Sequence, residues 1–291
     1  MALNKGTFKT RSLTAAIFVV VMLAGLLISH WTFFLLFTVI HFGCWTEYQK
    51  LVGLIDKDYK SISELHRYGI MIAGWCIMLY FTNNDFKFGD FVLHSIGWWL
   101  ALLFAFLLPI TELLFSHNIS PKNIGYSALG LIYISLSCGL MIDLLIFPSI
   151  PFMSMPLMPI IIIACMWIND TMAYIVGSLI GKTPFSKISP KKTWEGTIGG
   201  SILSSVLMGY IAFALDESFV FGKTFIWWTI LAIIASVSGT FGDLLESKLK
   251  RMAEVKDSGR IMPGHGGFLD RFDSLLLAIP FVWLYVSFLI N

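Results

Sequence analysis

The residues best suited to chemistry lie in one polar stretch, 247–274, between two strongly apolar runs. It holds six Lys/Arg, four Asp/Glu, one His and four Gly, in a chain whose mean hydropathy is +0.79. Carboxylates bind hard cations, basic side chains neutralise phosphates, and glycines let backbone N–H groups approach a phosphate. The mixture indicates a phosphate-bearing substrate held with a divalent cation at a membrane surface.

A carboxylate closes the apolar run that precedes this stretch. Counted from Thr224 at about 1.5 Å per residue, Asp243 lies roughly 28 Å along a helix, at the edge of the hydrocarbon. It shares one helix face with Glu246, Ser247 and Lys250. An acid at this depth is costly unless it is paired or bound to a cation. By position alone, Asp243 fits an ion pair as well as a metal site.

Two more carboxylates, Asp270 and Asp273, stand at i and i+3 where the chain returns to the membrane. They are predicted to lie in or just before the first turn of a helix, where carboxylates also suit the helix dipole. Because Asp243 comes from the other end of the stretch, we favour a hard-cation site. The hypothesis is that the three aspartates hold one or two divalent ions, such as Mg²⁺, with substrate phosphates.

Basic residues and glycines between these carboxylates are candidates for handling phosphate. Taken singly, each basic residue is better explained as a membrane-surface anchor, and a lone loop histidine is more often structural. The candidates are Lys250, Arg251, Lys256, Asp257, Gly264, His265, Gly266, Gly267 and Arg271.

A second polar segment, 181–196, is predicted on the same side of the membrane and offers Lys191 and Lys192 to substrate. Asp170 lies within the preceding apolar run and is a functional candidate for that reason, although it could bond neighbouring polar groups instead. Residues 177–183 resemble a phosphate-binding P-loop, but the glycines are one residue too close and no strand precedes them. We interpret these glycines as helix-packing faces.

Membrane-spanning helices must position these groups. The chain is 57% hydrophobic and only 13% charged, against about 25% in soluble domains. An all-α, polytopic membrane protein is therefore expected, as one domain over 1–291 with N-terminal spans in 1–155 and a catalytic half in 156–291. Nine stretches suit a bilayer crossing. They are 12–30, 31–48, 67–83, 91–115, 123–147, 156–180, 196–215, 224–245 and 273–290.

The distribution of positive charge predicts the orientation. With a cytoplasmic N-terminus, 18 of the 20 Lys/Arg fall in cytoplasmic segments, and only Lys87 and Lys223 fall outside. The first apolar run is expected to be a retained span, because no small-x-small cleavage site follows it. The four cysteines lie in apolar runs without CxxC spacing, which predicts packing roles.

Taken together, these motifs resemble the phosphatidate cytidylyltransferase (CDP-diacylglycerol synthase) family. Its signature of Ser, Lys-Arg, Lys-Asp, Pro-x-His-Gly-Gly and Asp-Arg-x-Asp is matched in order over the C-terminal half. The matching residues are Ser247, Lys250-Arg251, Lys256-Asp257, Pro263–Gly267 and Asp270–Asp273. The 189–196 element and Gly242-Asp243-Leu244-Leu245-Glu246 also resemble family motifs, whereas 1–155 match only as hydrophobic spans.

The resemblance implies that CTP and phosphatidate are converted to CDP-diacylglycerol and pyrophosphate with magnesium. It also implies a homodimer in the bilayer, in the inner or plasma membrane if bacterial, with a cytoplasmic active site and no nucleic-acid partner. Asp243, Asp270 and Asp273 would be metal ligands, with Ser247 close by. Alternatives are a CTP-dependent polyprenol or lipid kinase and, from another class, an ion-coupled transporter using Asp143, Asp170 and Asp243. A CDP-alcohol phosphotransferase fits less well, because its expected aspartate spacing is missing.

Overall fold

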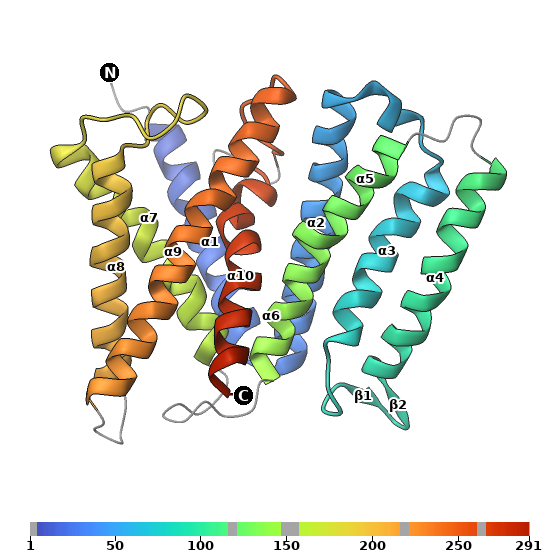
Figure 1. Ribbon diagram of the computed structural model, residues 1–291, viewed down its shortest axis with the longest axis horizontal. Helices are drawn as coiled ribbons and strands as arrows, with labels where there is room; N and C mark the ends of the chain where they lie inside the picture. The colour runs from blue at the N-terminus through green and yellow to red at the C-terminus, as the bar shows by residue number, and fades with distance from the viewer. Residues whose placement is uncertain (1–4, 116–120, 147–156, 216–220, 261–265, 291) are drawn as a thin grey trace. The chain divides into compact units, whose positions relative to one another are not determined.

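The protein is almost entirely helical, as its composition predicts. The computed structural model describes residues 5–115, 121–146, 157–215, 221–260 and 266–290. Figure 1 shows the elements in chain order. The long helices are α1 (Lys5–Leu27), α2 (His30–Ile55), α3 (Glu64–Tyr80), α4 (Leu93–Phe115), α7 (Leu157–Ile180), α8 (Trp194–Leu215), α9 (Phe221–Met252) and α10 (Leu269–Ile290).

Shorter elements complete the described chain. A 3₁₀ turn, η1, covers Lys57–Ser61, and a small antiparallel hairpin pairs β1 (Lys87–Phe88) with β2 (Phe91–Val92). One continuous helical segment is built from α5 (Pro121–Gly130), a π-helical stretch η2 (Leu131–Leu136) and α6 (Ser137–Ile146). Each of the nine predicted spans therefore coincides with a helical segment of the described residues.

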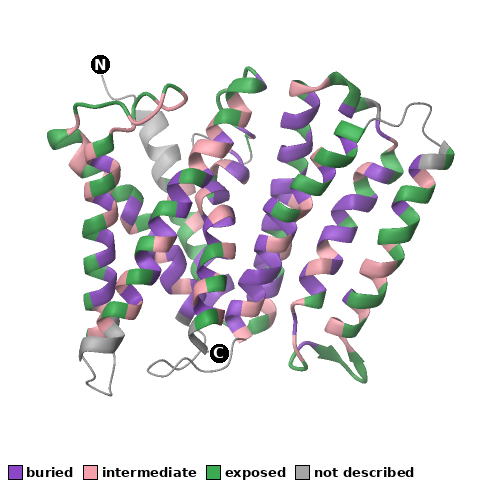
Figure 2. Ribbon diagram, in the orientation of Figure 1, coloured by how far each residue is buried: buried purple, intermediate pink, exposed green. Residues whose placement is uncertain are grey.

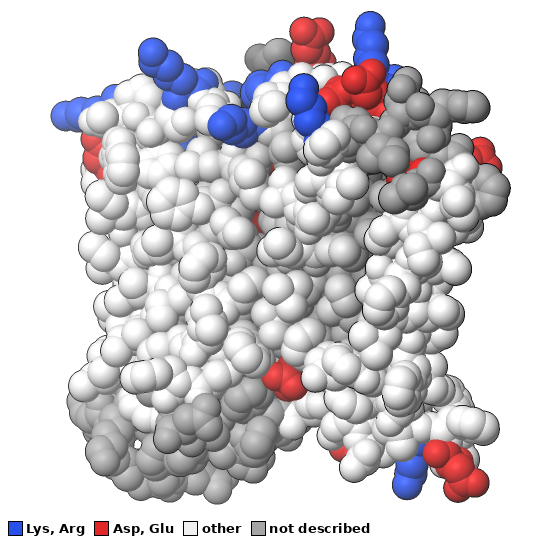
Figure 3. Space-filling model, turned by 45° about the vertical axis from the view of Figure 1, so that its right-hand side comes forward, with Lys and Arg blue, Asp and Glu red and all other residues white. Residues whose placement is uncertain are grey.

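Five helical segments among the described residues are long and apolar enough to cross a membrane. They are Leu93–Glu112, Pro121–Ile146, Met158–Ile180, Phe225–Met252 and Leu269–Phe288. Figure 2 shows many exposed positions along the sides of the helices. Large apolar residues such as Phe106 and Ile202 are among the exposed ones. Figure 3 shows most Lys and Arg at the upper edge of the view and mostly uncharged residues below them. This pattern suits helices surrounded by lipid.

The chain forms two compact units. Unit 1 comprises Met1–Asp143 and Leu249–Phe272, and unit 2 comprises Leu144–Lys248 and Asp273–Asn291, so the boundaries fall within α6, α9 and α10. In unit 1, α1 packs on α2, and α3 packs on α4 and η2. Its core includes the fully buried Trp45, whose indole N–H donates to Ser135 Oγ of η2 at 2.8 Å.

In unit 2, the main helix pair is α7 with α8. Gly177 lies at this contact and packs as the sequence predicts, facing Gly196 of α8. A side chain at Gly196 would meet the backbone of Ala173 and Gly177, and one at Gly200 would meet the backbone of Ala173. Small residues thus let the two backbones approach closely. All four cysteines are buried and free, as expected.

The helix ends differ from the predicted loop boundaries. The predicted membrane spans end at 245 and begin again at 273, but α9 continues to Met252 and α10 begins at Leu269. Lys250 and Arg251 stand in the last turn of α9. Positive charge there interacts favourably with the helix dipole, which explains why the helix extends beyond the apolar run. The prediction that Asp270 lies in the first turn of a helix is confirmed.

Candidate active site

Three carboxylates converge in unit 2. Asp243 and Glu246 stand one turn apart on α9, Asp273 comes from α10, and their oxygen atoms all lie within 4.8 Å of one another. Glu246 is fully buried and Asp273 is 7% exposed, whereas Asp243 is partly open. Carboxylates packed this closely repel one another at low dielectric. An oxygen-only set of this kind suits a hard divalent cation such as Mg²⁺.

Gly242 makes this convergence possible. A Cβ at this position would lie 2.5 Å from the backbone oxygen of Asp273 and 3.0 Å from Ser274 Cα. No side chain fits such a gap without moving the helices apart, so the backbone of α9 touches that of α10 at this point. Because Gly242 has no side chain, the two helices approach closely there, and this places the neighbouring Asp243 near Asp273.

A basic side chain also reaches the cluster. Lys192 forms an ion pair with Asp243, and both side chains are partly exposed. Lys192 precedes α8, whose Thr193 side chain caps the helix by accepting from Gly196 N at 3.2 Å. Asp170 on α7 lies within electrostatic range of both Lys192 and Asp243. Unit 2 therefore places one basic side chain, that of Lys192, in the same region as four carboxylates. These carboxylates are Asp170, Asp243, Glu246 and Asp273.

The segment that carries Lys192 is a closed turn. Phe185 N donates to Lys192 O at 2.7 Å, and Trp194 N donates to Thr183 O at 3.0 Å. The Glu195 carboxylate accepts from Thr183 Oγ1 at 2.8 Å and from the Lys182 and Thr183 amides. Hydrogen bonds from its own backbone and from Thr183 lower the pKa of Glu195 to about 2, so it stays ionised at neutral pH.

A second network, in unit 1, holds the connection between α9 and α10, residues 253–268, which we call the signature loop. Asp270 accepts from Lys250 Nζ at 2.7 Å, from Ser258 N at 2.9 Å and from Gly267 N at 2.8 Å, and Ser258 Oγ lies 2.9 Å from the same carboxylate. Gly266 adopts a left-handed φ of 85°, and a Cβ there would meet the Asp270 carboxylate at 2.6 Å. Asp270 is thus engaged by the loop's own donors.

The structure regroups the predicted ligands. Asp243 and Asp273 come together as expected, and the third carboxylate of their cluster is Glu246, which the sequence placed on the same face as Asp243 without a ligand role. Asp270 belongs to the loop network described above. The clue to Glu246 was the i, i+3 spacing from Asp243 combined with complete burial, and burial is visible only in the structure.

The remaining candidates take surface positions or lie outside the described chain. Ser247 is half-buried on α9, one residue after Glu246. The side chains of Lys191, Arg251, Lys256, Asp257 and Arg271 are exposed. Gly264 and His265 fall outside the described residues, so their roles stay predictions.

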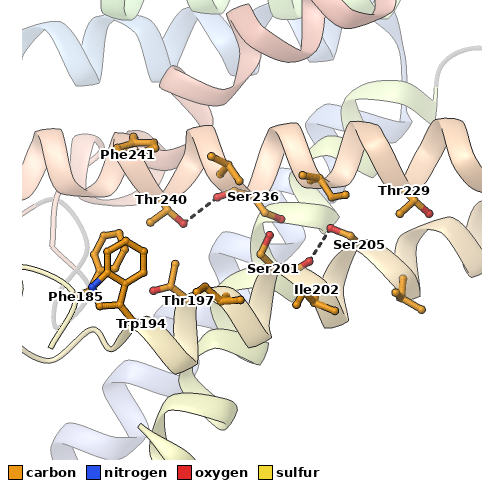
Figure 4. A pocket seen from close by; sticks show the side chains of 14 residues that line it. Phe185, Trp194, Thr197, Ser201, Ile202, Ser205, Thr229, Ser236, Thr240 and Phe241 are labelled. Atoms are coloured by element: carbon orange, nitrogen blue, oxygen red, sulfur yellow. Dashed lines mark hydrogen bonds between the residues drawn. The ribbon is translucent and has the colours of Figure 1, made fainter. Parts of the chain in front are cut away.

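An apolar cavity of about 410 Å³ runs between α8 and α9 in unit 2. Figure 4 shows side chains of both helices lining it, with Phe185 and Trp194 at one end. Three hydroxyl groups of its wall donate to carbonyl groups of their own helices. Ser205 donates to Ser201 O at 2.6 Å, Thr240 to Ser236 O at 2.9 Å, and Thr229 to Phe225 O at 2.7 Å. The cavity wall therefore suits a hydrocarbon.

The cavity adjoins the charged residues along the chain. Thr240 and Phe241 in its wall stand just before Asp243 on α9, and Trp194 stands two residues after Lys192. An apolar chain in the cavity would thus end beside an ammonium group and a carboxylate cluster. This combination suits an amphipathic substrate with an anionic head and an apolar tail.

The helical membrane fold and the carboxylate cluster are those expected of an integral-membrane nucleotidyltransferase. The model of the cytidylyltransferase family matches residues 9–289, and the chain belongs to that family. It is 35% identical over 189 residues to the phosphatidate cytidylyltransferase of Bacillus subtilis, covering 64% of this chain and 66% of that protein. It is 42% identical over 138 residues to that of Synechocystis, covering 46% and 44%.

A longer alignment has lower identity. The phosphatidate cytidylyltransferase of Haemophilus influenzae is 29% identical over 256 residues, which cover 84% of this chain and 85% of the relative. The match to the Bacillus subtilis and Synechocystis proteins spans less than two thirds of their lengths. The family model, which matches residues 9–289, establishes family membership over nearly the whole chain.

Proposed function

We propose that this protein is a phosphatidate cytidylyltransferase, which makes CDP-diacylglycerol and pyrophosphate from CTP and phosphatidate. The observation that carries the proposal is the cluster of Asp243, Glu246 and Asp273 beside Lys192, in a chain of the cytidylyltransferase family. The names of the relatives agree with it. Phospholipid biosynthesis is the corresponding cellular role.

The chemistry requires charge neutralisation more than a strong base. The phosphate of phosphatidate carries about −1.5 to −2 charges at pH 7, so its oxygen attacks the α-phosphorus of CTP without prior deprotonation. A P–O bond forms there as the bond to the β-phosphate oxygen breaks, and pyrophosphate leaves with the electron pair. The protein must therefore reduce repulsion between two anions and align them.

The residues of the chain divide this work. Asp243, Glu246 and Asp273 would hold Mg²⁺, which supplies electrostatic stabilisation to the phosphates when bound. Lys191 and Lys192 bring positive charge to the same unit. In unit 1, Lys250 is held by Asp270, and the exposed Arg251 and Lys256 are placed to meet anionic headgroups and pyrophosphate, with Arg271 as a further exposed basic residue. No nucleophilic side chain is needed.

Nine membrane crossings with a cytoplasmic N-terminus are part of the proposal. Support comes from the agreement between predicted spans and helical segments and from the distribution of Lys and Arg. The active site would then face the cytoplasm, where CTP is available. Alkaline phosphatase fused to the C-terminus should be active outside the cytoplasm, and a cytoplasmic location of the fusion would contradict the topology.

The cavity between α8 and α9 supplies a place for an acyl chain. We expect Ser201→Trp, which fills it, to raise the KM for dioleoyl phosphatidate about tenfold while the KM for CTP is unchanged. The reason is that each methylene group kept out of an apolar site costs about 0.8 kcal/mol. Dihexanoyl phosphatidate should be affected much less.

The matched control for this variant is Leu203→Trp, on an exposed part of α8 outside the cavity wall. It should leave the KM values of both lipids unchanged. Equal effects of Ser201→Trp on long-chain and short-chain lipid would show that the cavity does not hold the acyl chain.

The decisive assay is product analysis with the purified protein in detergent–lipid micelles. CTP labelled in the cytosine ring, phosphatidate and Mg²⁺ should yield labelled CDP-diacylglycerol and unlabelled pyrophosphate, and EDTA should stop the reaction. A CTP-dependent lipid kinase would release labelled CDP instead. Uptake of a solute into proteoliposomes without CTP would favour the transporter. A homodimer is also proposed, and light scattering in detergent would give its mass.

A further inference from the structure

Glu47 is a buried acid in α2, in the N-terminal part of the chain for which the sequence motifs offer no chemistry. Its side chain is 5% exposed. The carboxylate accepts three hydrogen bonds, from Ser258 Oγ at 2.7 Å, Phe268 N at 3.0 Å and Leu269 N at 2.8 Å. All four residues belong to unit 1.

The donors come from both ends of the signature loop. Ser258 directly follows the Lys256-Asp257 pair, whereas Phe268 and Leu269 follow the paired glycines, and Leu269 is the first residue of α10. Glu47 therefore fastens two loop segments ten residues apart to a helix more than 200 residues earlier in the sequence. A Cβ at Gly259 or Gly267 would collide with the Glu47 carboxylate, so the loop backbone fits closely around it.

The bonding continues from Glu47 to the loop carboxylate. Ser258 Oγ lies 2.7 Å from Glu47 and 2.9 Å from Asp270, and Asp270 in turn holds Lys250 Nζ at 2.7 Å. Hydrogen bonds to a buried carboxylate are stronger than neutral ones, and a negative charge at the start of a helix is favourable. Glu47 is thus linked through Ser258 to the hydrogen bonds that hold Asp270 and Lys250.

We propose that Glu47 is a positioning residue for the reaction. It acts through the loop by setting where Lys250, Lys256 and the start of α10 are held, and it does not touch the substrate. This inference rests on the proposed function, because its kinetic test needs the cytidylyltransferase reaction. It assigns the N-terminal part of the chain a direct share in organising the loop that carries the signature motifs.

The test compares Glu47→Gln with Glu47→Asp in the full-length protein. In Glu47→Gln an amide N–H₂ faces backbone donors, so we expect kcat to fall about 10- to 100-fold, the range that a displacement of about 1 Å produces. Glu47→Asp keeps the charge and should recover part of kcat. A double-mutant cycle with Ser258→Ala should be non-additive.

Two controls separate positioning from stability. Glu64→Gln removes an exposed acid and should leave kcat unchanged, and Leu51→Ala removes a buried side chain of α2 and lowers the melting temperature. If Leu51→Ala loses as much kcat as Glu47→Gln at the same loss of melting temperature, the effect is merely structural and the inference is overturned. A kcat of Glu47→Gln within twofold of wild type overturns it as well.

A readout without activity keeps the test independent of the proposed function. Trypsin cleavage after the exposed Arg260 should become at least tenfold faster in Glu47→Gln, because the loop loses its anchor, and should stay unchanged in Glu64→Gln. Should Glu47→Gln fail to fold, Glu47→Asp and Ser258→Ala serve the same comparison. An inactive wild type refutes the proposed function alone, whereas unchanged cleavage in the variants refutes the anchoring by Glu47.

Discussion

Asp243→Asn is expected to reduce CDP-diacylglycerol formation by at least about 10³-fold in the purified protein. The substitution keeps the shape of the side chain but removes one negative charge from the cluster with Glu246 and Asp273. Electrostatic groups of this kind contribute about 3–4 kcal/mol to transition-state stabilisation, and a lost metal ligand also weakens cation binding. Initial rates at saturating CTP and increasing Mg²⁺ would measure the effect.

The matched control is Asp90→Asn, because Asp90 is an exposed acid in the β1–β2 turn. It should retain wild-type kcat. Cation binding can be followed without turnover by electron paramagnetic resonance of Mn²⁺, which we expect Asp243→Asn and Glu246→Gln to weaken about tenfold or more. Near-normal activity and Mn²⁺ affinity in Asp243→Asn would remove Asp243 from the metal site and leave only its ion pair with Lys192.

Gly242→Ala should damage the site without changing any charged residue. The new Cβ would lie 2.5 Å from the Asp273 backbone oxygen, so α9 and α10 must separate by roughly 1 Å to restore ordinary contact. Displacements of this size cost about 10²-fold in rate, and overpacking of this kind costs about 1–3 kcal/mol. We therefore expect kcat to fall about 100-fold, with weaker Mn²⁺ binding and a lower melting temperature.

Gly125→Ala provides the control for this substitution. Gly125 also lies in a helix, α5, but nothing stands within 4 Å of a Cβ built on it. The change should preserve activity and raise helix stability slightly, by up to about 1 kcal/mol. If Gly242→Ala behaved like Gly125→Ala, the close contact of α9 with α10 would not be required for the carboxylate cluster.

Several features of the protein could be predicted because they depend on local patterns. Runs of about 20 apolar residues place the helices, and charged residues flank them because a charge inside lipid is costly. The i, i+3 spacing put Asp243 and Glu246 on one face, and the loop motifs identified the family. The apolar run marks the end of the predicted span at 245 but not the end of the helix, because α9 continues to Met252 with Lys250 and Arg251 in its last turn, where positive charge suits the helix dipole.

The partners of each carboxylate could not be read from spacing. Asp270 and Asp273 are equivalent as i and i+3 acids in the sequence, yet Asp270 is held by Lys250 and loop amides while Asp273 joins Asp243 and Glu246. The difference depends on where the loop backbone presents its donors. Glu47 was overlooked for a related reason, because its partners lie more than 200 residues away.

The amino-acid sequence alone determined that this is a helical membrane protein of the cytidylyltransferase type, with its acidic and basic chemistry concentrated between its last two helices. Hydropathy, helical periodicity and motif order are properties of residues that are close in the sequence, so they can be read without knowing the fold. Only the tertiary structure decided which acids converge and which residue anchors the signature loop. Those outcomes depend on the contact of α9 with α10 at Gly242 and on the backbone donors around Glu47, and both arise when distant segments pack together.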